Sequence, residues 1–279
     1  MSGGEDKLPE NGRRSLTVVV PCYNEADNVP AVIPAIAEYC RKCGWCLIVV
    51  NDGSRDNTRA LLDALSASHG FRVITHKLNR GYGGAIKSGI EAASTYWVVT
   101  VDADGQHNLD DVKNLWEEAE RADADMVVGS RQGLPHASLY RGLGKFLIKG
   151  FARWAVPGNP IHDINSGMKL YRRDLAMNVL PSCPNGMAYS DVVLLMFVQN
   201  RCLVLERPIT IQARAKGVST ISTMTAVETV GEITTIVVMF NPFRIFLPLA
   251  AIFFLLVSPG GGAARSSTAS CPRRRAFSC

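Results

Sequence analysis

Two aspartates follow directly after an apolar stretch near residue 100, where their carboxylates could bind a metal ion. The segment VVTVDADGQHNLDD at 98–111 runs from apolar and β-branched residues into Asp102 and Asp104, with Gln106 close behind. Residues two apart in a strand point the same way, so both carboxylates would face one side. Oxygen ligands of this kind select Mg²⁺ or Mn²⁺, usually together with substrate phosphates. The pair predicts a metal that bridges a diphosphate, although an acidic surface turn has the same pattern.

Two further polar stretches follow apolar runs in the same way. PCYNEADN occupies 21–28 and NDGSRDN occupies 51–57. Ligands of open α/β sheets bind at the carboxyl ends of strands, so three such ends together favour a nucleotide site. The alternative remains that Asn24 and Asp27 cap a helix and that Asp52 belongs to a turn.

The glycine-rich segment NRGYGGAIKSG at 79–89 invites comparison with two nucleotide-binding motifs. A dinucleotide fingerprint requires Gly or Ala at position 86, and a P-loop requires Gly directly before Lys87. Ile86 stands there, so both motifs fail. The segment instead predicts a loop that opens a helix, whose N–H groups and Lys87 side chain approach a donor phosphate or sugar.

Short apolar runs alternate with longer amphipathic segments over the first half of the chain. The predicted strands are 16–20, 46–50, 71–75, 96–101 and 125–129. Their apolar residues are continuous, which is typical of a mainly parallel sheet covered on both faces, and the repeated βα pattern indicates the α/β class. The later elements are predicted as a helix near 139–153, a strand at 167–173, a helix at 188–199 and a strand at 203–211.

The chain divides into four parts by composition. We predict a flexible leader at 1–14, a catalytic domain at 15–225, a membrane-associated segment at 226–257 and a disordered Gly/Ser/Arg-rich tail at 258–279. The apolar run from Ile245 to Val257 is shorter than the roughly 20 residues of a full span. It indicates a kinked partial span or an in-plane helix, with a helix packed on the domain as the alternative.

Composition sets outer limits on the function. The 279 residues are 47% hydrophobic, enough for a substantial core, and the net charge of +5 comes partly from arginines 273–275. Such a tail is thin evidence for nucleic acid, and it fits a negatively charged surface such as lipid at least as well. Cys40, Cys43 and Cys46 have metal-like spacing without a nearby fourth ligand, so we predict buried, reduced thiols. The polar N-terminus has no signal peptide, which predicts a catalytic domain facing the cytoplasm.

Seven stretches together resemble the family 2 glycosyltransferases of the GT-A fold, in particular those that use dolichyl or polyprenyl phosphate. In chain order they are VVVPCYNEADNV, VVNDGSRDNT, NRGYGGAIKSGI, DADGQH, GSR at 129–131, DINSGMKLYRRD at 163–174 and RAKGVS at 214–219. The resemblance covers residues 16 to about 220. It implies a Rossmann-like, mainly parallel sheet flanked by helices, followed by membrane-associated helices.

The resemblance also implies roles for individual residues. By this resemblance the donor nucleotide is contacted by Pro21, Tyr23, Glu25 and Asp52, with Lys87 expected beside them. The metal is held by Asp102, Asp104 and Gln106. The acceptor phosphate is bound by Arg131, Arg214 and Lys216. Asp102, Asp104 and Arg131 would be catalytic. Family members often carry Ser-Lys where this chain has Ser219-Thr220. The lysine contact to the acceptor phosphate is therefore not expected at this position.

The implied reaction is metal-dependent transfer of a sugar, with inversion, from a nucleotide diphosphate sugar of the GDP-mannose or UDP-glucose type to a polyprenyl or dolichyl phosphate. A phosphate monoester with a second pKa near 6 is already largely a dianion at neutral pH and needs no general base. A hydroxyl acceptor would need one, for which Asp191 is the candidate.

Three other functions stay open or lose support. A processive polysaccharide synthase would carry Gln-x-x-Arg-Trp, but Gly150 precedes Arg153-Trp154 at the glutamine position. A non-catalytic sugar-nucleotide scaffold would not need the whole acidic set at 102–106. Transfer to a hydroxyl in polysaccharide or glycolipid synthesis stays open, as does a homo-oligomer. The expected partners are the sugar donor, the lipid phosphate and membrane lipid, without nucleic acid.

Overall fold

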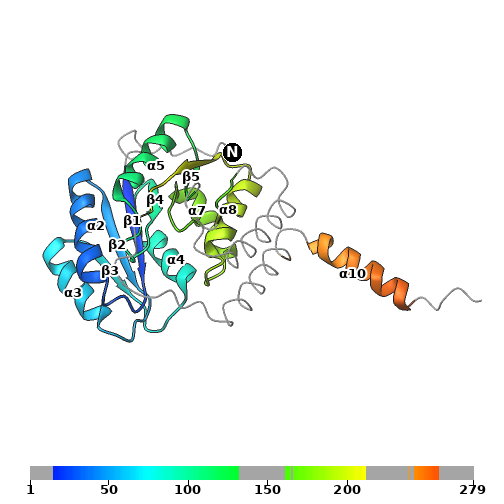
Figure 1. Ribbon diagram of the computed structural model, residues 1–279, viewed down its shortest axis with the longest axis horizontal. Coiled ribbons are helices and arrows are strands. Elements are labelled where there is room, and N and C mark those ends of the chain that lie inside the picture. Colours follow the sequence, from blue (N-terminus) through cyan, green and yellow to red (C-terminus); the bar gives the residue numbers. More distant parts are fainter. Residues whose placement is uncertain (1–14, 132–160, 165, 212–237, 239–241, 258–279) are drawn as a thin grey trace, which may run out of the picture. The chain divides into compact units, whose positions relative to one another are not determined.

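The computed structural model describes residues 15–131, 161–164, 166–211, 238 and 242–257. It separates into two units, residues 1–236 and 237–279, which are considered individually. The first unit contains a seven-stranded sheet with helices on both faces (Figure 1). The predicted helix at 139–153 and the predicted phosphate ligands Arg214 and Lys216 lie outside the described residues.

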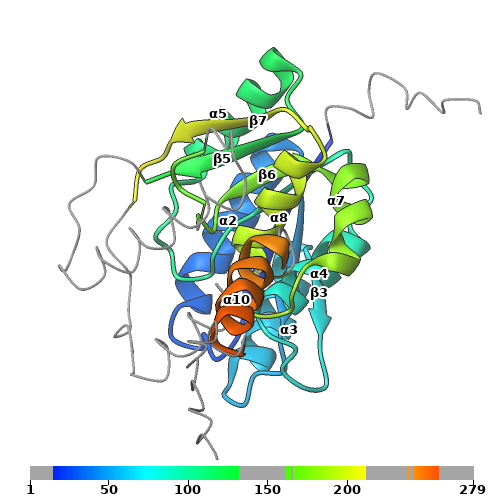
Figure 2. The ribbon, with the colours of Figure 1, turned by 90° about the vertical axis from the view of Figure 1, so that its right-hand side faces the viewer.

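The sheet is mainly parallel, as the continuous apolar strands predicted. Its strands are β1 (Leu16–Cys22), β2 (Cys46–Asn51), β3 (Arg72–Thr75), β4 (Trp97–Thr100), β5 (Met126–Ser130), β6 (Lys169–Arg172) and β7 (Val204–Pro208). The order is β3-β2-β1-β4-β6-β5-β7, and Figure 2 shows β6 beside β5. β6 runs antiparallel to both of its neighbours, β4 and β5. The start of β6 therefore lies at the edge where the parallel strands end.

The helices form a layer on each face of the sheet. They are α2 (Val29–Cys43), α3 (Thr58–His69), α4 (Tyr82–Ala92), α5 (Leu109–Ala122), α7 (Arg173–Val179) and α8 (Tyr189–Gln199), with a 3-10 turn at Leu180–Ser182. One buried cluster joins Ile33 of α2, Leu62 of α3 and Leu115 of α5 to the sheet. Helices α4, α7 and α8 lie on the opposite side from α2 and α3 (Figure 1).

Helix ends follow local chemistry. α2 and α3 are followed by Gly44 and Gly70 in the left-handed conformation, which glycine adopts without steric cost. Asn108 caps α5 by accepting a hydrogen bond from the backbone N–H of Asp110, and acidic residues in the first turn complement the helix dipole. These ends fix where each connecting loop begins.

The cysteine prediction is confirmed for Cys22, Cys40 and Cys183, which are buried free thiols. It is wrong for Cys43 and Cys46, which are exposed. Cys43 is the last residue of α2 and Cys46 is the first residue of β2, so both lie at the rim of the core.

The second unit contains α10 (Pro242–Val257), which continues through Pro248. Its exposed apolar residues include Phe243, Phe246, Leu247, Leu249, Ile252, Phe253 and Phe254. A helix of 16 residues is roughly 24 Å long, against about 30 Å of bilayer hydrocarbon. Among the described segments, no helix meets the length and hydropathy needed to cross a membrane.

Helix α4 packs closely against β1 at Gly89, and this contact allows a test of the packing. Alanine normally stabilises a helix interior relative to glycine by about 1 kcal/mol. A Cβ atom at Gly89 would lie 2.3 Å from Cγ1 of Val19, which is completely buried. We expect Gly89→Ala to lower the free energy of unfolding by about 1–3 kcal/mol in urea denaturation. Glu91→Ala, on the exposed side of α4, serves as the control, and a Gly89→Ala protein at least as stable as wild type would contradict this packing.

Candidate active site

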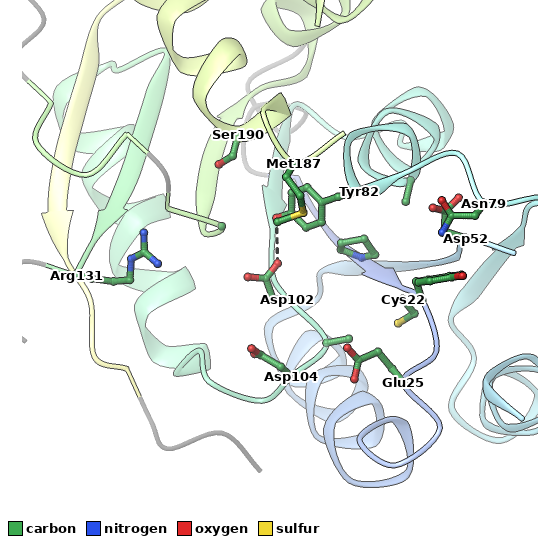
Figure 3. A pocket seen from close by; sticks show the side chains of 15 residues that line it. Cys22, Glu25, Asp52, Asn79, Tyr82, Asp102, Asp104, Arg131, Met187 and Ser190 are labelled. Atoms are coloured by element: carbon green, nitrogen blue, oxygen red, sulfur yellow. Dashed lines mark hydrogen bonds between the residues drawn. The ribbon is translucent and has the colours of Figure 1, made fainter. Parts of the chain in front are cut away.

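A pocket of about 440 Å³ opens at the carboxyl edge of the parallel strands. Figure 3 shows acidic side chains from several loops turned toward a common space, with Arg131 across from them. The lining residues are Pro21, Cys22, Tyr23, Glu25, Asp52, Asn79, Tyr82, Ala85, Asp102, Ala103, Asp104, Arg131, Gly167, Met187 and Ser190. Strand ends, loops and two helices thus contribute to one cavity.

The two aspartates reach this cavity by a route that differs from the predicted one. β4 ends at Thr100, so Asp102 and Asp104 lie in a turn and not on one side of a strand. Asp104 accepts a hydrogen bond from the N–H of Gln106 (3.0 Å), and Gly105 has a φ of 74°. Both carboxylates line the pocket, and Ala103 between them is buried.

Asp102 is held from two sides. The Tyr82 hydroxyl donates a hydrogen bond to Asp102 Oδ1 at 3.0 Å, the dashed line in Figure 3. Burial and the neighbouring Asp102 carboxylate raise the pKa of Tyr82, which keeps the phenol protonated as a donor. On the other side, a Cβ atom at Gly167 would lie 2.3 Å from Asp102 Oδ2. Only glycine leaves room for this carboxylate.

Asp52 is a buried anchor for the loop after β3. Its Oδ1 accepts from the N–H of Arg80 and its Oδ2 from the N–H of Gly81, both at 2.8 Å. His76 Nδ1 lies 2.6 Å from Asp52 Oδ1, while His76 Nε2 lies 2.9 Å from the Ser88 hydroxyl. Asp52 therefore fixes the loop that brings Asn79 to the pocket.

Arg131 is clamped by Asp163. Its Nε and Nη2 atoms donate to the two Asp163 oxygens at 2.8 and 2.9 Å, and its backbone N–H donates to the same carboxylate at 2.9 Å. The hydrogen bond to Asp163 raises the pKa of Arg131. Burial alone would raise the pKa of Asp163, but the guanidinium holds it below its usual value. The pair presents a fixed cation to the pocket.

The glycines of the 81–84 segment serve packing against the loop before α8. Gly83 N–H donates to Gly186 O and Gly84 N–H donates to Asn185 O. A Cβ atom at Gly81 would lie 2.5 Å from Asn185 O. The prediction that the N–H groups of this loop face a donor phosphate is therefore wrong for Gly83 and Gly84, and the Gly81 N–H binds Asp52.

Most of the predicted site residues that the structure describes converge on the pocket, and three of them do not line it. The pocket contains Pro21, Tyr23, Glu25, Asp52, Asp102, Asp104 and Arg131. The Lys87 ammonium donates to Cys183 O and to Asn185 Oδ1, and Gln106 is absent from the pocket wall. Asp191, the candidate base, is buried in the first turn of α8 and does not line the pocket either.

The sequence patterns assigned no individual role to several residues that build the site. Asn79, Tyr82, Met187 and Ser190 line the pocket, and Asp163 holds Arg131. Tyr82 and Asp163 lie inside motifs already noted, NRGYGG and DINSG, and this position was the available signal. The Cys22 thiol also lines the pocket, and burial raises its pKa, so it is no ready nucleophile.

The donor set fits a divalent metal of the Mg²⁺ or Mn²⁺ type. Asp102 and Asp104 supply oxygen ligands on the pocket wall. Within the described ranges, no group of three or more His, Cys, Asp or Glu side chains could hold a metal by itself. Two carboxylates are the usual protein share for Mg²⁺, with phosphates and water completing its shell.

Comparison with known proteins identifies the family. The glycosyl transferase family 2 profile matches residues 17–180, more than half of the chain. The chain therefore belongs to this family, and the protein is a glycosyltransferase, which removes the scaffold alternative.

Two relatives illustrate the branch of the family. Polyprenol monophosphomannose synthase of Mycolicibacterium smegmatis is 30% identical over 78% of this chain and 85% of its own length. Dolichyl-phosphate beta-glucosyltransferase of Dictyostelium discoideum is 30% identical over 66% of this chain and 62% of its own length. The chain thus spans less than two thirds of the second relative.

A solved structure supports the fold. Glucosyl-3-phosphoglycerate synthase from Mycobacterium tuberculosis, crystallised with Mn²⁺, uridine diphosphate and phosphoglyceric acid, superposes with a TM-score of 0.64. The sequences are 20% identical, and the match covers 83% of this chain and 80% of that one. The predicted GT-A fold of the catalytic domain is confirmed.

Lys169 is a buried lysine that does not line the pocket, and its titration can be measured. Burial lowers the pKa of Lys169 from 10.5 to about 8, while Asp191 and Asp163 act in the opposite direction. At a pH between these two pKa values, Lys169 keeps its proton in the unfolded chain and has released it in the folded protein. The folded state therefore gains stability as the pH rises. We expect wild type to gain about 2 kcal/mol of unfolding free energy relative to Lys169→Met between pH 7.5 and 10. Urea denaturation of both proteins at both pH values gives this difference. The same change in unfolding free energy with pH in wild type and Lys169→Met would contradict the lowered pKa of Lys169.

Proposed function

We propose that the protein transfers a sugar from a nucleotide diphosphate sugar to a polyprenyl or dolichyl phosphate, with inversion and with Mg²⁺ or Mn²⁺. The observation that carries the proposal is the pocket itself, where two carboxylates and a clamped arginine face one cavity. The names of the two relatives, a polyprenol monophosphomannose synthase and a dolichyl-phosphate beta-glucosyltransferase, support the acceptor class.

The donor side of the pocket is assigned to the end of β1 and the loops after β2 and β3. Pro21, Tyr23 and Glu25 supply a wall for the nucleotide, and Asn79 is held there by the Asp52 network. Asp102 and Asp104 would hold the metal, with Gln106 as a third candidate ligand. The metal would supply positive charge to the departing nucleotide diphosphate.

The acceptor side of the pocket is assigned to Arg131 and the start of α8. Asp163 fixes the guanidinium, so a phosphate dianion entering the pocket meets a preorganised cation. This dianion attacks without a general base. Asp191 does not line the pocket, which weakens the alternative of a base-activated hydroxyl acceptor. Arg214 and Lys216 stay in the proposal as further phosphate ligands, and Lys87 as a residue that supports the donor loop.

The proposed acceptor also explains an apolar C-terminal helix. A polyprenyl phosphate presents its headgroup at the bilayer surface while its chain stays in the hydrocarbon. α10 exposes phenylalanines and leucines without an acidic residue, as expected for a helix that inserts partly into a bilayer. We propose membrane association, with the catalytic domain on the cytoplasmic side.

Asp104→Asn tests the metal assignment. The change removes one ligand charge at the pocket and no core contact, so the protein should keep its melting temperature while transfer falls by at least about 100-fold. Sugar transfer to a short-chain polyprenyl phosphate is measured with Mn²⁺ and radiolabelled donor. Asp63→Asn, an exposed acid on α3, is the control. A folded Asp104→Asn enzyme with wild-type turnover would exclude the metal role.

The membrane assignment is tested by flotation of the full chain with anionic liposomes. Replacing Phe246, Phe253 and Phe254 with Gln removes exposed apolar surface from α10, so the fraction bound should fall more than about tenfold. Leu203→Gln, at an exposed apolar position of the first unit, should bind like wild type. Equal flotation of the triple variant and wild type would show that α10 does not anchor the protein.

A further inference from the structure

Lys169, the first residue of β6, is a buried cation directly behind the pocket. The residue is 2% exposed, and its side chain is among the largest fully buried ones of the described residues. Lys169 pairs in register with Thr100 on β4 and with Val128 on β5. Thr100 comes shortly before Asp102 in the sequence, and Val128 comes shortly before Arg131. Burying an ammonium group is costly unless protein atoms replace its water.

Three protein oxygens replace that water. Lys169 Nζ donates to Ile164 O at 3.1 Å and also to Ser166 O and Ser190 Oγ. The Ser190 hydroxyl donates in turn to Ser166 O at 2.7 Å. An ammonium has three N–H donors, so every donor has an acceptor. These contacts tie the backbone before β6 to the first turn of α8.

The residues that Lys169 contacts are next in sequence to residues of both sides of the pocket, the Arg131 side and the Asp102 side. Asp163, next to Ile164, clamps Arg131. Gly167, next to Ser166, lies directly against the Asp102 carboxylate, and its carbonyl accepts from the Thr100 hydroxyl at 2.6 Å. A shift of this backbone would move the guanidinium and open space beside Asp102.

We propose that Lys169 is a positioning residue for the glycosyl transfer reaction: through Ile164 O, Ser166 O and Ser190 it fixes the Asp163–Arg131 pair and the wall of the pocket at Gly167. It touches neither substrate in this arrangement. The proposal rests on the proposed function for the identity of the acceptor phosphate, which Arg131 would bind. Asp191, Asp163, Arg131 and Asp102 are charged groups that act on the pKa of this ammonium.

A double-mutant cycle with the full chain tests this role. Lys169→Met should lower kcat/KM for a short-chain polyprenyl phosphate on the order of 100-fold, as expected when a binding group is displaced by about 1 Å. If Lys169 acts through Arg131, adding Lys169→Met to an Arg131→Ala protein should lower kcat/KM by a further factor of less than about three. Lys113→Met, an exposed lysine on α5, should leave activity unchanged. Multiplicative losses in the cycle would overturn the proposal.

A second readout does not depend on the acceptor. In Lys169→Met, hydrogen–deuterium exchange should increase in peptides that contain Ser166, Gly167 and Ser190, while peptides from β1 and β2 keep wild-type exchange. Nucleoside diphosphate binding without metal should stay within about twofold. Unchanged exchange in these peptides, or an increase throughout the sheet, would overturn the positioning role. If Lys169→Met does not fold, Lys169→Gln enters the same cycle and exchange measurements.

These readouts separate two failures. If wild type transfers no sugar to polyprenyl phosphate, the proposed function fails, while the exchange data still decide the role of Lys169. If wild type transfers sugar and the cycle is multiplicative, only the positioning role fails.

Discussion

The antiparallel insertion of β6 between two parallel strands is the constraint on which the pocket depends. Parallel strands gather their carboxyl ends at one edge, which brings Asp52, Asp102 and Arg131 to the same side of the sheet. Because β6 runs the other way, the chain before it crosses that edge and delivers Asp163 and Gly167 to the same place. A sheet with β6 parallel would place this segment at the far edge, and the arginine clamp could not form.

Two polar pairs shape the pocket, the buried Asp52–His76 pair and the half-buried Arg131–Asp163 pair. Asp52 accepts from two backbone N–H groups and lies against His76, while Asp163 accepts two hydrogen bonds from the Arg131 guanidinium. A buried charge without a partner is costly, so each pair holds its loop in one arrangement. A site assembled in this way needs little reorganisation when charge develops on a leaving diphosphate.

Sequence patterns predicted the first half of the fold and the acidic side of the site. Apolar runs identify β1, β2 and β4, and polar residues at the ends of such runs identified Asp52 and Asp102. Residues 81–84 show where the prediction failed. The glycines suggested a phosphate loop, but they allow close contact with the backbone of Asn185 and Gly186. Local sequence contains no record of which distant segment packs there. The same holds for Lys169, since a lysine in a short strand shows no sign of burial, and for Asp163, whose partner lies far along the chain.

The central claim is that the acceptor is a lipid phosphate, and competition between two lipids tests it most directly. The full-length protein is incubated with Mn²⁺, GDP-mannose or UDP-glucose, and equal amounts of a short-chain polyprenyl phosphate and the matching polyprenol, and products are separated by mass spectrometry. We expect a hexosyl polyprenyl phosphate from one of the donors and no hexosyl polyprenol, because Arg131 lies in the pocket where it could bind the phosphate and a phosphate dianion needs no general base. Hexosyl polyprenol as the main product would contradict the account.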